Sequence, residues 1–587
     1  MAIKFIPRLC RTFLQDNLYG YKTQSFKSHL GVSMIAREVK VQVKQGVVVG
    51  QQKYLPNGNL FSYFQGIPYA VPPLGPLRFK SPVPLERFSQ PELDCTKERD
   101  VSHQRDPFTS ELVGSEDCLF LNVYAPENAN HKLPVMVWIH GGGFFFGNGN
   151  SDYFFPKHLM EEDVIVVTIN YRLGALGFLC LPEENIYGNA GLKDQRLALQ
   201  WVKDNISNFN GDSENITIFG ESAGASSVHM HMYANHGKSL FHKAIMQSGT
   251  ANMEWVFQTN PDFKVRQLAK HLNCTATSSK DILAFLQSEQ ITPELLLAQT
   301  LKVLTPEERR CGLPLPFKPV IEDISSPDSF INAPIVETLK KKNAIDIPVI
   351  MGYNSAEGIV MVFNAMRKLG LYEQDLSRCI PRNLVLNSSS SSVSRITKLM
   401  RDFYFGGKII DESVLNELSN LLGDYFFIFD MQLAAEYHSR FQPKSPLYFY
   451  KFNYVGEHNM YKKMFQLEDL KGACHGDELF YLFQSLENEA QLAQKDFIFA
   501  KNLCKLWANF AKYGNPTPNS ANTPSIGTYW TPVENIGEEQ QPFVLDYLEI
   551  DAKSQMLQDP DNDRVKFWRE IYNNYDSIDY SRFSSKL

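Results

Sequence analysis

Short apolar runs separated by amphipathic stretches recur along most of the chain. Val39, Val41 and Val43 alternate with polar residues ahead of Gly46, and this alternation predicts the first strand of a β-hairpin. Helical patterns such as residues 192–209 lie between later apolar runs. Further buried strands are predicted over residues 134–139, 164–169, 216–219, 244–246, 348–351, 448–452 and 543–545. Alternating strands and helices favour an α/β fold with a mostly parallel central sheet that helices cover on both faces.

The predicted strands extend across nearly all of the 587 residues, which favours one large domain with long insertions. We place this domain at residues 35–578, between a leader at 1–34 and a tail at 579–587. The serine run at residues 388–392 predicts a surface loop within the domain.

Composition narrows the partners that such a domain can have. Hydrophobic residues make up 43% of the chain, and the formal net charge of −7 provides no basic surface for nucleic acid. The cysteines form no C-x-x-C pair and the histidines no H-E-x-x-H motif, so no metal is expected. No apolar run approaches the ~18 residues that a membrane-spanning helix needs.

The most informative segment is Gly220-Glu-Ser-Ala-Gly224, which follows the predicted strand 216–219 and precedes small residues suited to a helix start. A G-x-S-x-G sequence between a strand and a helix is typical of a nucleophile elbow, a sharp turn that exposes its serine. A side chain at either glycine would collide with the neighbouring strand or helix. The segment therefore predicts Ser222 as a nucleophile.

The tetrahedral intermediate that such a serine forms carries an oxyanion, which needs backbone N–H donors. The segment His140-Gly-Gly-Gly-Phe144 follows a predicted strand and matches the glycine-rich loop that supplies donors in lipases and esterases. We expect the amides of Gly142, Gly143 and Ala223 to form the oxyanion hole. The histidine of the loop is then structural.

The acid and the base are expected later in the chain, because this fold places them in the order serine, acid, histidine. His438, His458 and His475 are the candidate bases, and His475 is favoured because Gly472 and Gly476 place it on a loop before an apolar helical stretch. For the acid, the residue pattern leaves four candidates open: Glu357, Asp346, Asp323 and Glu322.

Several further motifs are specific: Phe64-Gln-Gly-Ile-Pro-Tyr-Ala70, Ser115-Glu-Asp-Cys-Leu-Phe-Leu-Asn122, Tyr171-Arg-Leu-Gly-Ala-Leu-Gly-Phe178, Gly188-Asn-Ala-Gly191 and Gly472-Ala-Cys-His-Gly476. With the elbow and the triple-glycine loop, they make residues 37–575 resemble the carboxylesterase and cholinesterase family of α/β-hydrolases, most closely the insect alpha-esterases. The resemblance implies that Ser222 is the nucleophile, Glu357 the acid and His475 the base. It also implies that Glu221 and Ser248 lie beside this triad.

The same resemblance separates subfamilies. Cholinesterases stack a quaternary ammonium on a tryptophan inside the loop that their first disulfide closes. Here residues 95–118 contain no Trp or Tyr, and Val360 stands where another aromatic is usual, so choline esters are expected to be poor substrates. Juvenile hormone esterases typically read Gly-Gln-Ser-Ala-Gly, and Glu221 counts against that assignment.

Two structural expectations follow from the resemblance. Trp255, Leu313 and Leu315 align with the acyl pocket of the family, which implies an apolar wall that holds aliphatic or aromatic acyl groups without sharp selection. Plain core packing is the alternative for the two leucines. Cys95 and Cys118 match the first disulfide of the family, although a reducing compartment would oppose that bond.

We therefore predict a serine carboxylesterase that hydrolyses uncharged aliphatic or aromatic esters, including xenobiotic or lipid esters, through an acyl-enzyme and without a cofactor. Organophosphates are expected to inhibit it by phosphorylating Ser222. Two alternatives stay open. One is a lipid-directed hydrolase, and the other is a protein that sequesters esters or organophosphates without turnover.

The two ends of the chain predict a location within the cell. Lys4, Arg8 and Arg11 recur at helical spacing beside apolar residues, a pattern typical of a helix that contacts a membrane surface or of a transit peptide, not of a secretory signal. The sequence Ser585-Lys-Leu587 matches the tripeptide that directs import into peroxisomes. We expect a cytosolic or peroxisomal protein with peripheral membrane contact through its first residues.

Overall fold

The computed structural model describes residues 37–55, 57–127, 129–234, 240–310, 312–323, 326, 328–340, 345–442, 444–484, 493–518, 525–537 and 542–575. The predicted leader at 1–34 and tail at 579–587 lie outside these residues, and so do the basic helical pattern and the Ser-Lys-Leu tripeptide. Within the described ranges no helix is long and apolar enough to cross a membrane.

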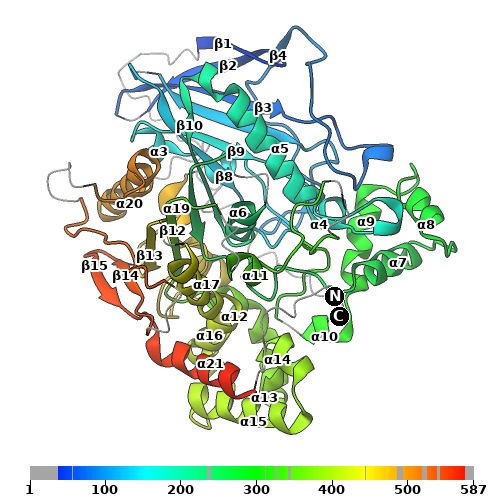
Figure 1. The fold of residues 1–587 in the computed structure, drawn as a ribbon, viewed down its shortest axis with the longest axis vertical. Coiled ribbons are helices and arrows are strands. Elements are labelled where there is room, and N and C mark those ends of the chain that lie inside the picture. The colour runs from blue at the N-terminus through cyan, green and yellow to red at the C-terminus, as the bar shows by residue number, and fades with distance from the viewer. Residues whose placement is uncertain are drawn as a thin grey trace, which may run out of the picture.

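A mixed sheet of 13 strands forms the centre of the described chain (Figure 1). Neighbouring strands from β9 to β14 are parallel, whereas the pairs toward both edges of the sheet are antiparallel, apart from the short strand β4, which pairs parallel to β2. This arrangement confirms the expected α/β fold with its mostly parallel central sheet. The strands follow the order β1 (Arg37–Val43), β2 (Gly46–Tyr54), β3 (Leu60–Pro68), β7 (Phe120–Pro126), β9 (Ile165–Ile169), β8 (Leu133–Ile139), β10 (Gly211–Glu221), β11 (Lys243–Gln247), β12 (Val349–Asn354), β13 (Leu447–Phe452), β14 (Asp546–Ile550) and β15 (Gln555–Gln558), with β4 (Glu92–Asp94) paired to β2.

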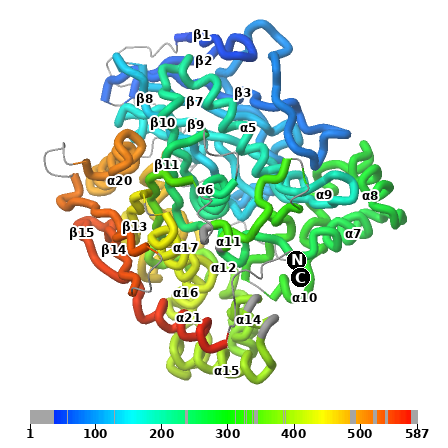
Figure 2. The backbone as a smooth tube through the Cα atoms, in the orientation of Figure 1, coloured from blue at the N-terminus to red at the C-terminus, as the bar shows by residue number. Residues whose placement is uncertain are grey.

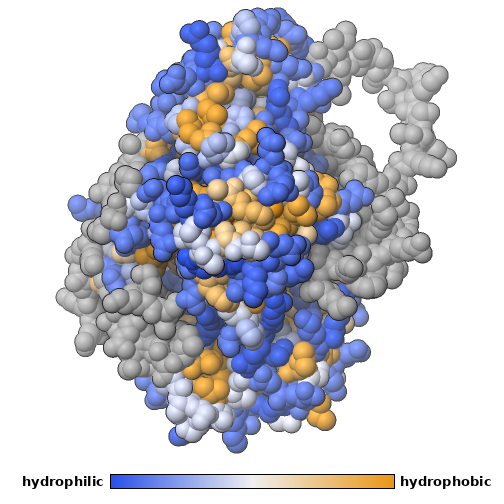
Figure 3. Space-filling view, turned by 90° about the vertical axis from the view of Figure 1, so that its right-hand side faces the viewer, coloured by the Kyte–Doolittle hydropathy of each residue, from blue (hydrophilic) through white to orange (hydrophobic). Residues whose placement is uncertain are grey.

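Helices cover both faces of this sheet. Successive side chains of a strand point to opposite faces, and in β8 Val135 and Val137 enter one hydrophobic core while Met136 and Trp138 enter another. The first core contains residues of α5 (Ala190–Asn205), α6 (Ala223–Tyr233) and α17 (Phe429–Phe441), and the second contains residues of α20 (Gln494–Tyr513). The face of the molecule seen in Figure 3 is largely hydrophilic, with hydrophobic side chains gathered in separate patches.

Two helical insertions account for much of the length of the chain. Figure 2 shows the early strands at one end of the molecule, β14 and β15 farther down, and helices α14 to α16 at the opposite end. Between β11 and β12 lie α7 (Pro261–His271), α8 (Ser279–Leu286), α9 (Pro293–Thr300), α10 (Pro306–Arg310) and α11 (Ile335–Lys340). Between β12 and β13 lie α12 (Ile359–Ala365), α13 (Leu369–Gln374), α14 (Arg382–Asn387), α15 (Ser390–Met400), α16 (Leu415–Gly423) and α17.

Two sequence predictions about local structure are wrong. The strand predicted at 543–545 lies just before β14, because the amide of Leu545 donates to the side chain of Asp559 and not to a neighbouring strand. Most of the serine run is helical instead of a loop, because the Ser389 hydroxyl accepts a hydrogen bond of 3.2 Å from the amide of Ser392. This bond caps the start of α15.

The disulfide expected between Cys95 and Cys118 is absent from the structure, where both residues are free and buried thiols. Burial raises the pKa of the Cys95 thiol to about 12 and that of Cys118 still higher. The loop between them is held by other means. Strands β5 (Gln104–Arg105) and β6 (Leu112–Val113) pair within it, and the Gln104 side chain donates to the carbonyl of Gly147 over 2.9 Å.

Candidate active site

Ser222 stands at the sharp turn between β10 and α6 with φ 55° and ψ −122°. A positive φ is strained for any residue with a side chain. Backbone pressed against the turn explains the glycines around it: a Cβ on Gly224 would lie 2.0 Å from the carbonyl oxygen of Ile139, and one on Gly220 2.6 Å from the same atom. The sequence therefore forms the elbow that its pattern predicts.

The next two strand ends of the sheet lie beside this turn. Ser248 follows β11 with φ 53°, and Glu357 follows β12. The Ser222 amide donates to Gln247 over 2.8 Å, and the Ser248 amide donates to Gly352 over 2.8 Å. The parallel pairing thus brings the carboxyl ends of three strands to one edge of the sheet.

Glu357 is completely buried and directs one carboxylate oxygen at a histidine ring. Its Oε2 lies 2.5 Å from Nδ1 of His475, which belongs to the loop between α18 (Met460–Phe465) and α19 (Leu479–Leu482). Its Oε1 accepts from the Ser248 hydroxyl over 2.5 Å and from the Asn354 amide over 2.7 Å. Both oxygens of the acid are therefore fixed, and the acid fixes the ring of His475.

The second ring nitrogen of His475 faces another carboxylate. Its Nε2 lies 3.0 Å from Oε1 of Glu221, the residue before the elbow serine. Burial on its own would lower the pKa of His475, but Glu221 and Glu357 outweigh burial and hold the pKa well above its usual value. Phe427 covers the ring, with centroids 4.3 Å apart. Within the described residues no hydrogen bond engages the Ser222 hydroxyl.

The glycine-rich loop after β8 lies directly against the elbow. A Cβ on Gly141 would lie 3.1 Å from the Cβ of Ser222, and Gly142 and Gly143 have φ values of 100° and 61°. In the part of the chain that the structure describes, the amides of Gly142, Gly143 and Ala223 donate no hydrogen bond to protein atoms. These amides are available to a ligand oxygen. The histidine of the loop stacks on Tyr171 with centroids 4.4 Å apart, away from the base position.

Sequence reasoning missed one buried acid beside the site. Glu478 receives hydrogen bonds from the side-chain amides of Gln247 over 3.0 Å and Asn354 over 2.5 Å. Burial raises the pKa of Glu478 to about 8, and the nearby charges of Glu221 and Glu357 act in the same direction. Its position three residues after His475 is the only signal in the sequence, and one helical turn of spacing is too common to indicate a role.

The other candidates from the sequence lie in different surroundings. Glu322 forms a buried ion pair of 2.7 Å with Lys193, Asp346 accepts from the Ser445 hydroxyl, and Asp323 is exposed. His438 is a buried core residue whose pKa burial lowers to about 4, and His458 lies 3.8 Å from Asp496. Of the four acids left open by the pattern, the structure brings Glu357 to His475.

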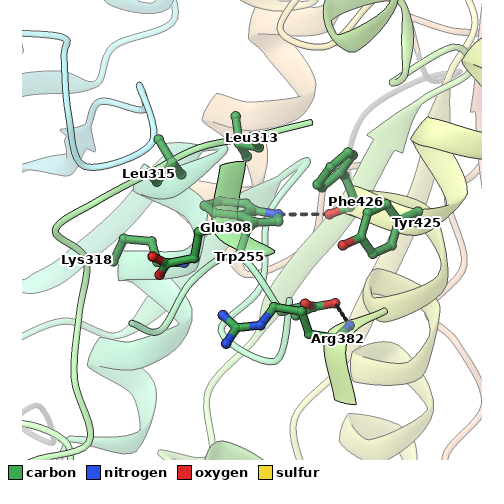
Figure 4. A pocket seen from close by; sticks show the side chains of 9 residues that line it. Trp255, Glu308, Leu313, Leu315, Lys318, Arg382, Tyr425 and Phe426 are labelled. Atoms are coloured by element: carbon green, nitrogen blue, oxygen red, sulfur yellow. Dashed lines mark hydrogen bonds between the residues drawn. The ribbon is translucent and has the colours of Figure 1, made fainter. Parts of the chain in front are cut away.

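A pocket of about 420 Å³, counting the space open to solvent, borders this edge of the sheet. Trp255, Leu313 and Leu315 line it together, and the Trp255 indole donates to the carbonyl of Phe426 over 2.9 Å (Figure 4). The wall expected to be apolar is only partly so. Four charged residues share the lining: Glu254, Glu308, Lys318 and Arg382.

The parallel sheet and the elbow at its carboxyl edge define the class as an α/β-hydrolase. The solved juvenile hormone esterase of Manduca sexta, with OTFP covalently attached, superposes with a TM-score of 0.80 over 92% of this chain and 100% of its own, at 29% identity. The juvenile hormone esterase of Tribolium castaneum is 38% identical over 82% of this chain and 84% of its own. A carboxylic ester hydrolase of Bombus ignitus is 31% identical over 92% of this chain and 95% of its own.

The model of the carboxylesterase family matches residues 37–568. The chain belongs to the carboxylesterase family, as its motifs predict, and is a carboxylic ester hydrolase. Its relatives among the insect enzymes include juvenile hormone esterases as well as general carboxylesterases.

Proposed function

We propose that the chain hydrolyses esters through an acyl-enzyme on Ser222, with His475 as the base and Glu357 as the acid that orients it. The observation that carries this proposal is the convergence of three strand ends. A strained serine there directly follows Glu221, whose carboxylate lies 3.0 Å from a histidine that is bound to a buried carboxylate at 2.5 Å. This is the set of groups that an activated serine nucleophile requires.

In the first step the Ser222 oxygen attacks the ester carbonyl while His475 takes the hydroxyl proton at Nε2. The carbonyl oxygen becomes an oxyanion, for which the amides of Gly142, Gly143 and Ala223 are the donors. The intermediate then collapses, and the proton on Nε2 passes to the departing alkoxide. Water repeats the sequence on the acyl-enzyme and releases the carboxylic acid and the free serine.

The 3.0 Å contact between His475 Nε2 and Glu221 Oε1 belongs to the enzyme before substrate is bound. For the first step Nε2 turns from Glu221 to the Ser222 hydroxyl. Glu221 then stabilises the imidazolium that forms, because an opposite charge a few ångströms away favours the charged form.

We propose uncharged aliphatic or aromatic esters as the general substrates. The ring centroid of Trp255 lies 6.4 Å from that of Phe144 in the glycine-rich loop and 6.2 Å from that of Phe427, the ring that covers His475. These aromatic rings form an apolar wall that continues from the catalytic groups into the pocket. Choline esters are expected to react poorly, because the loop 95–118 carries no Trp or Tyr for the cation.

Juvenile hormone hydrolysis is a second candidate function, favoured by the similarity of the chain to the juvenile hormone esterases of Tribolium castaneum and Manduca sexta. Glu221 in the elbow is the residue that argues against it. A substrate panel separates the two: kcat/KM is measured for juvenile hormone, for 1-naphthyl butyrate and for butyrylcholine. A value for juvenile hormone far above that for the naphthyl ester would favour the second candidate.

The chemistry itself is tested with a phosphorylating organophosphate and with an ester substrate. The adduct is expected on Ser222 by peptide mass spectrometry, together with loss of esterase activity in proportion to labelling. The Ser222→Ala variant is the control for labelling elsewhere. A burst of product followed by no turnover would instead favour the sequestering protein, and an adduct on another residue would overturn the assignment of the nucleophile.

A further inference from the structure

The pocket beside the active site is apolar on one side and charged on the other (Figure 4). Its apolar side borders the glycine-rich loop, because a Cβ on Gly143 would lie 2.9 Å from Leu315. An acyl chain that starts at Ser222 and passes Leu315 and Trp255 therefore reaches the charged side. The proposed mechanism uses none of the charged groups there.

Lys318 is a deeply buried cation of this pocket, and in the part of the chain that the structure describes it lacks a counterion within ion-pair distance. Its exposed fraction is only 8%, and within the described residues no hydrogen bond or ion pair engages its ammonium group. The neighbouring carboxylates are occupied elsewhere. Glu308 is bound to Lys264 at 2.8 Å, and Glu254 accepts from the backbone amide of Arg382 over 2.9 Å.

The groups around Lys318 leave an excess of positive charge. The positive charges of Lys264 and Arg382 add to that of Lys318. Only two carboxylates, Glu308 and Glu254, oppose these charges. Burial raises the pKa of Glu254, which favours its neutral form. Asp430 interacts with Glu254, and burial raises its pKa to about 8, so it is mainly protonated at neutral pH.

A buried ammonium group without a partner is costly, and the cost falls when a ligand supplies an anion. Burial, together with the charges of Lys264 and Arg382, lowers the pKa of Lys318 to about 7. Near neutral pH the lysine is thus partly protonated, and an anion bound beside it would raise that fraction.

We propose that this pocket binds a carboxylate at the far end of the acyl group, with Lys318 as its direct partner, so that monoesters of dicarboxylic acids are preferred substrates. This inference rests on the proposed function, because it places the acyl group of the Ser222 acyl-enzyme in the pocket. It makes Lys318 a specificity-determining residue with no part in the bond-breaking steps.

The test compares charged esters with uncharged isosteres of the same shape. Monoethyl succinate is paired with ethyl 4-methylpentanoate, and monoethyl adipate with ethyl 6-methylheptanoate, so that two chain lengths are sampled. The ethyl alcohol is a poor leaving group, which prevents the free carboxylate from attacking its own ester. The ratio of kcat/KM within each pair is measured for the wild type, Lys318→Met, Lys318→Arg and, as the surface control, Lys270→Met.

The wild type is expected to prefer the charged member of at least one pair, and Lys318→Met to lower that ratio by about tenfold or more, since a charge-assisted hydrogen bond is lost. Any change in kcat/KM that is common to both members of a pair cancels in this ratio. Lys318→Arg is expected to retain part of the preference, and Lys270→Met all of it. The wild-type ratio falls as pH rises through the pKa of Lys318, because the ammonium group loses its proton.

A ratio that is the same in the wild type and in Lys318→Met overturns the inference, and so does a wild type that prefers the uncharged member of both pairs. If Lys318→Met does not fold, the wild type alone provides the test. A wild-type ratio of kcat/KM that does not change with pH would then also overturn the inference. Failure of the proposed function looks different, because then neither member of a pair is hydrolysed and an organophosphate does not label Ser222.

Discussion

Ser222 and Ser248 occupy equivalent places at the ends of the neighbouring parallel strands β10 and β11. Both have left-handed φ values, 55° and 53°, and each donates its amide to the next strand end of the sheet. The residue after Ser248 also packs closely against Ser222, since a Cβ on Gly249 would lie 2.1 Å from the carbonyl oxygen of Ser222. The two side chains nevertheless have different surroundings.

The Ser248 hydroxyl is bound to Glu357 at 2.5 Å, whereas no hydrogen bond within the described residues engages that of Ser222. Ser222 also precedes a helix and lies against the glycine-rich loop, which provides the unbonded amides. A strained strand-end serine is therefore not a nucleophile by its backbone alone. The groups around its hydroxyl decide whether the serine can act as a nucleophile or instead holds the catalytic acid in place.

Replacing Ser222 by Ala is expected to cause the largest loss of activity among the substitutions at and around these two serines. We expect kcat to fall by about 10⁴-fold or more, because no other hydroxyl takes the place of the nucleophile. Esterase assays with a naphthyl ester measure the loss, and circular dichroism checks the fold. Activity close to that of the wild type would remove Ser222 from the mechanism.

Glu357 is bound to both the Ser248 hydroxyl and His475. Its substitution by Gln is expected to have the second-largest effect on activity. The amide cannot accept from His475 as the carboxylate does or stabilise the imidazolium, so we expect kcat to fall by roughly 10³- to 10⁴-fold. Asp346→Asn and Asp323→Asn are matched controls, since the sequence pattern offered both acids as alternatives, and each should retain near wild-type activity. A control more damaging than Glu357→Gln would contradict the choice of acid.

The substitution Ser248→Ala sharpens the comparison, because it removes a hydrogen bond to the acid Glu357 and leaves the nucleophile unchanged. The Oε1 of Glu357 then keeps only the Asn354 amide, and we expect kcat/KM to fall by about tenfold. The phosphorylation rate by an organophosphate should fall in parallel, with labelling still on Ser222. A loss as large as that of Ser222→Ala would mean that the two serines are not distinguished as we infer.

Replacing Glu221 by Gln is expected to have the smallest effect on activity at the pH optimum. Glu221 and Glu357 hold the pKa of His475 well above its usual value, and a general base works only above its own pKa. Loss of the Glu221 charge lowers that pKa, so the acidic limb of the kcat/KM profile should move measurably to lower pH. An unchanged or raised limb would show that the 3.0 Å contact with Glu221 does not control His475.

Sequence reasoning reached the elbow and the glycine-rich loop because both are local. A strand, a serine between two glycines and a helix follow one another in the chain, and this order alone predicts the elbow. The backbone that excludes a side chain at Gly224 belongs to the neighbouring strand β8, which only the fold brings there. The α/β class was accessible for the same reason, since the alternation of apolar runs marks individual strands and helices.

The partners of Ser222 were not local, and residue patterns left four acids and three histidines open, with His475 favoured among the histidines. Parallel pairing of β10, β11 and β12 places Ser222, Ser248 and Glu357 side by side although more than a hundred residues separate the first from the last. The roles of Glu221 and Glu478 near His475, the free thiols of Cys95 and Cys118 and the unpaired charge of Lys318 depend likewise on packing between distant segments. The sequence by itself determined the turn that presents a nucleophile and the class of sheet that holds it. Only the tertiary structure decided which charges surround that nucleophile, because electrostatic interactions depend on distances in space that no local pattern encodes.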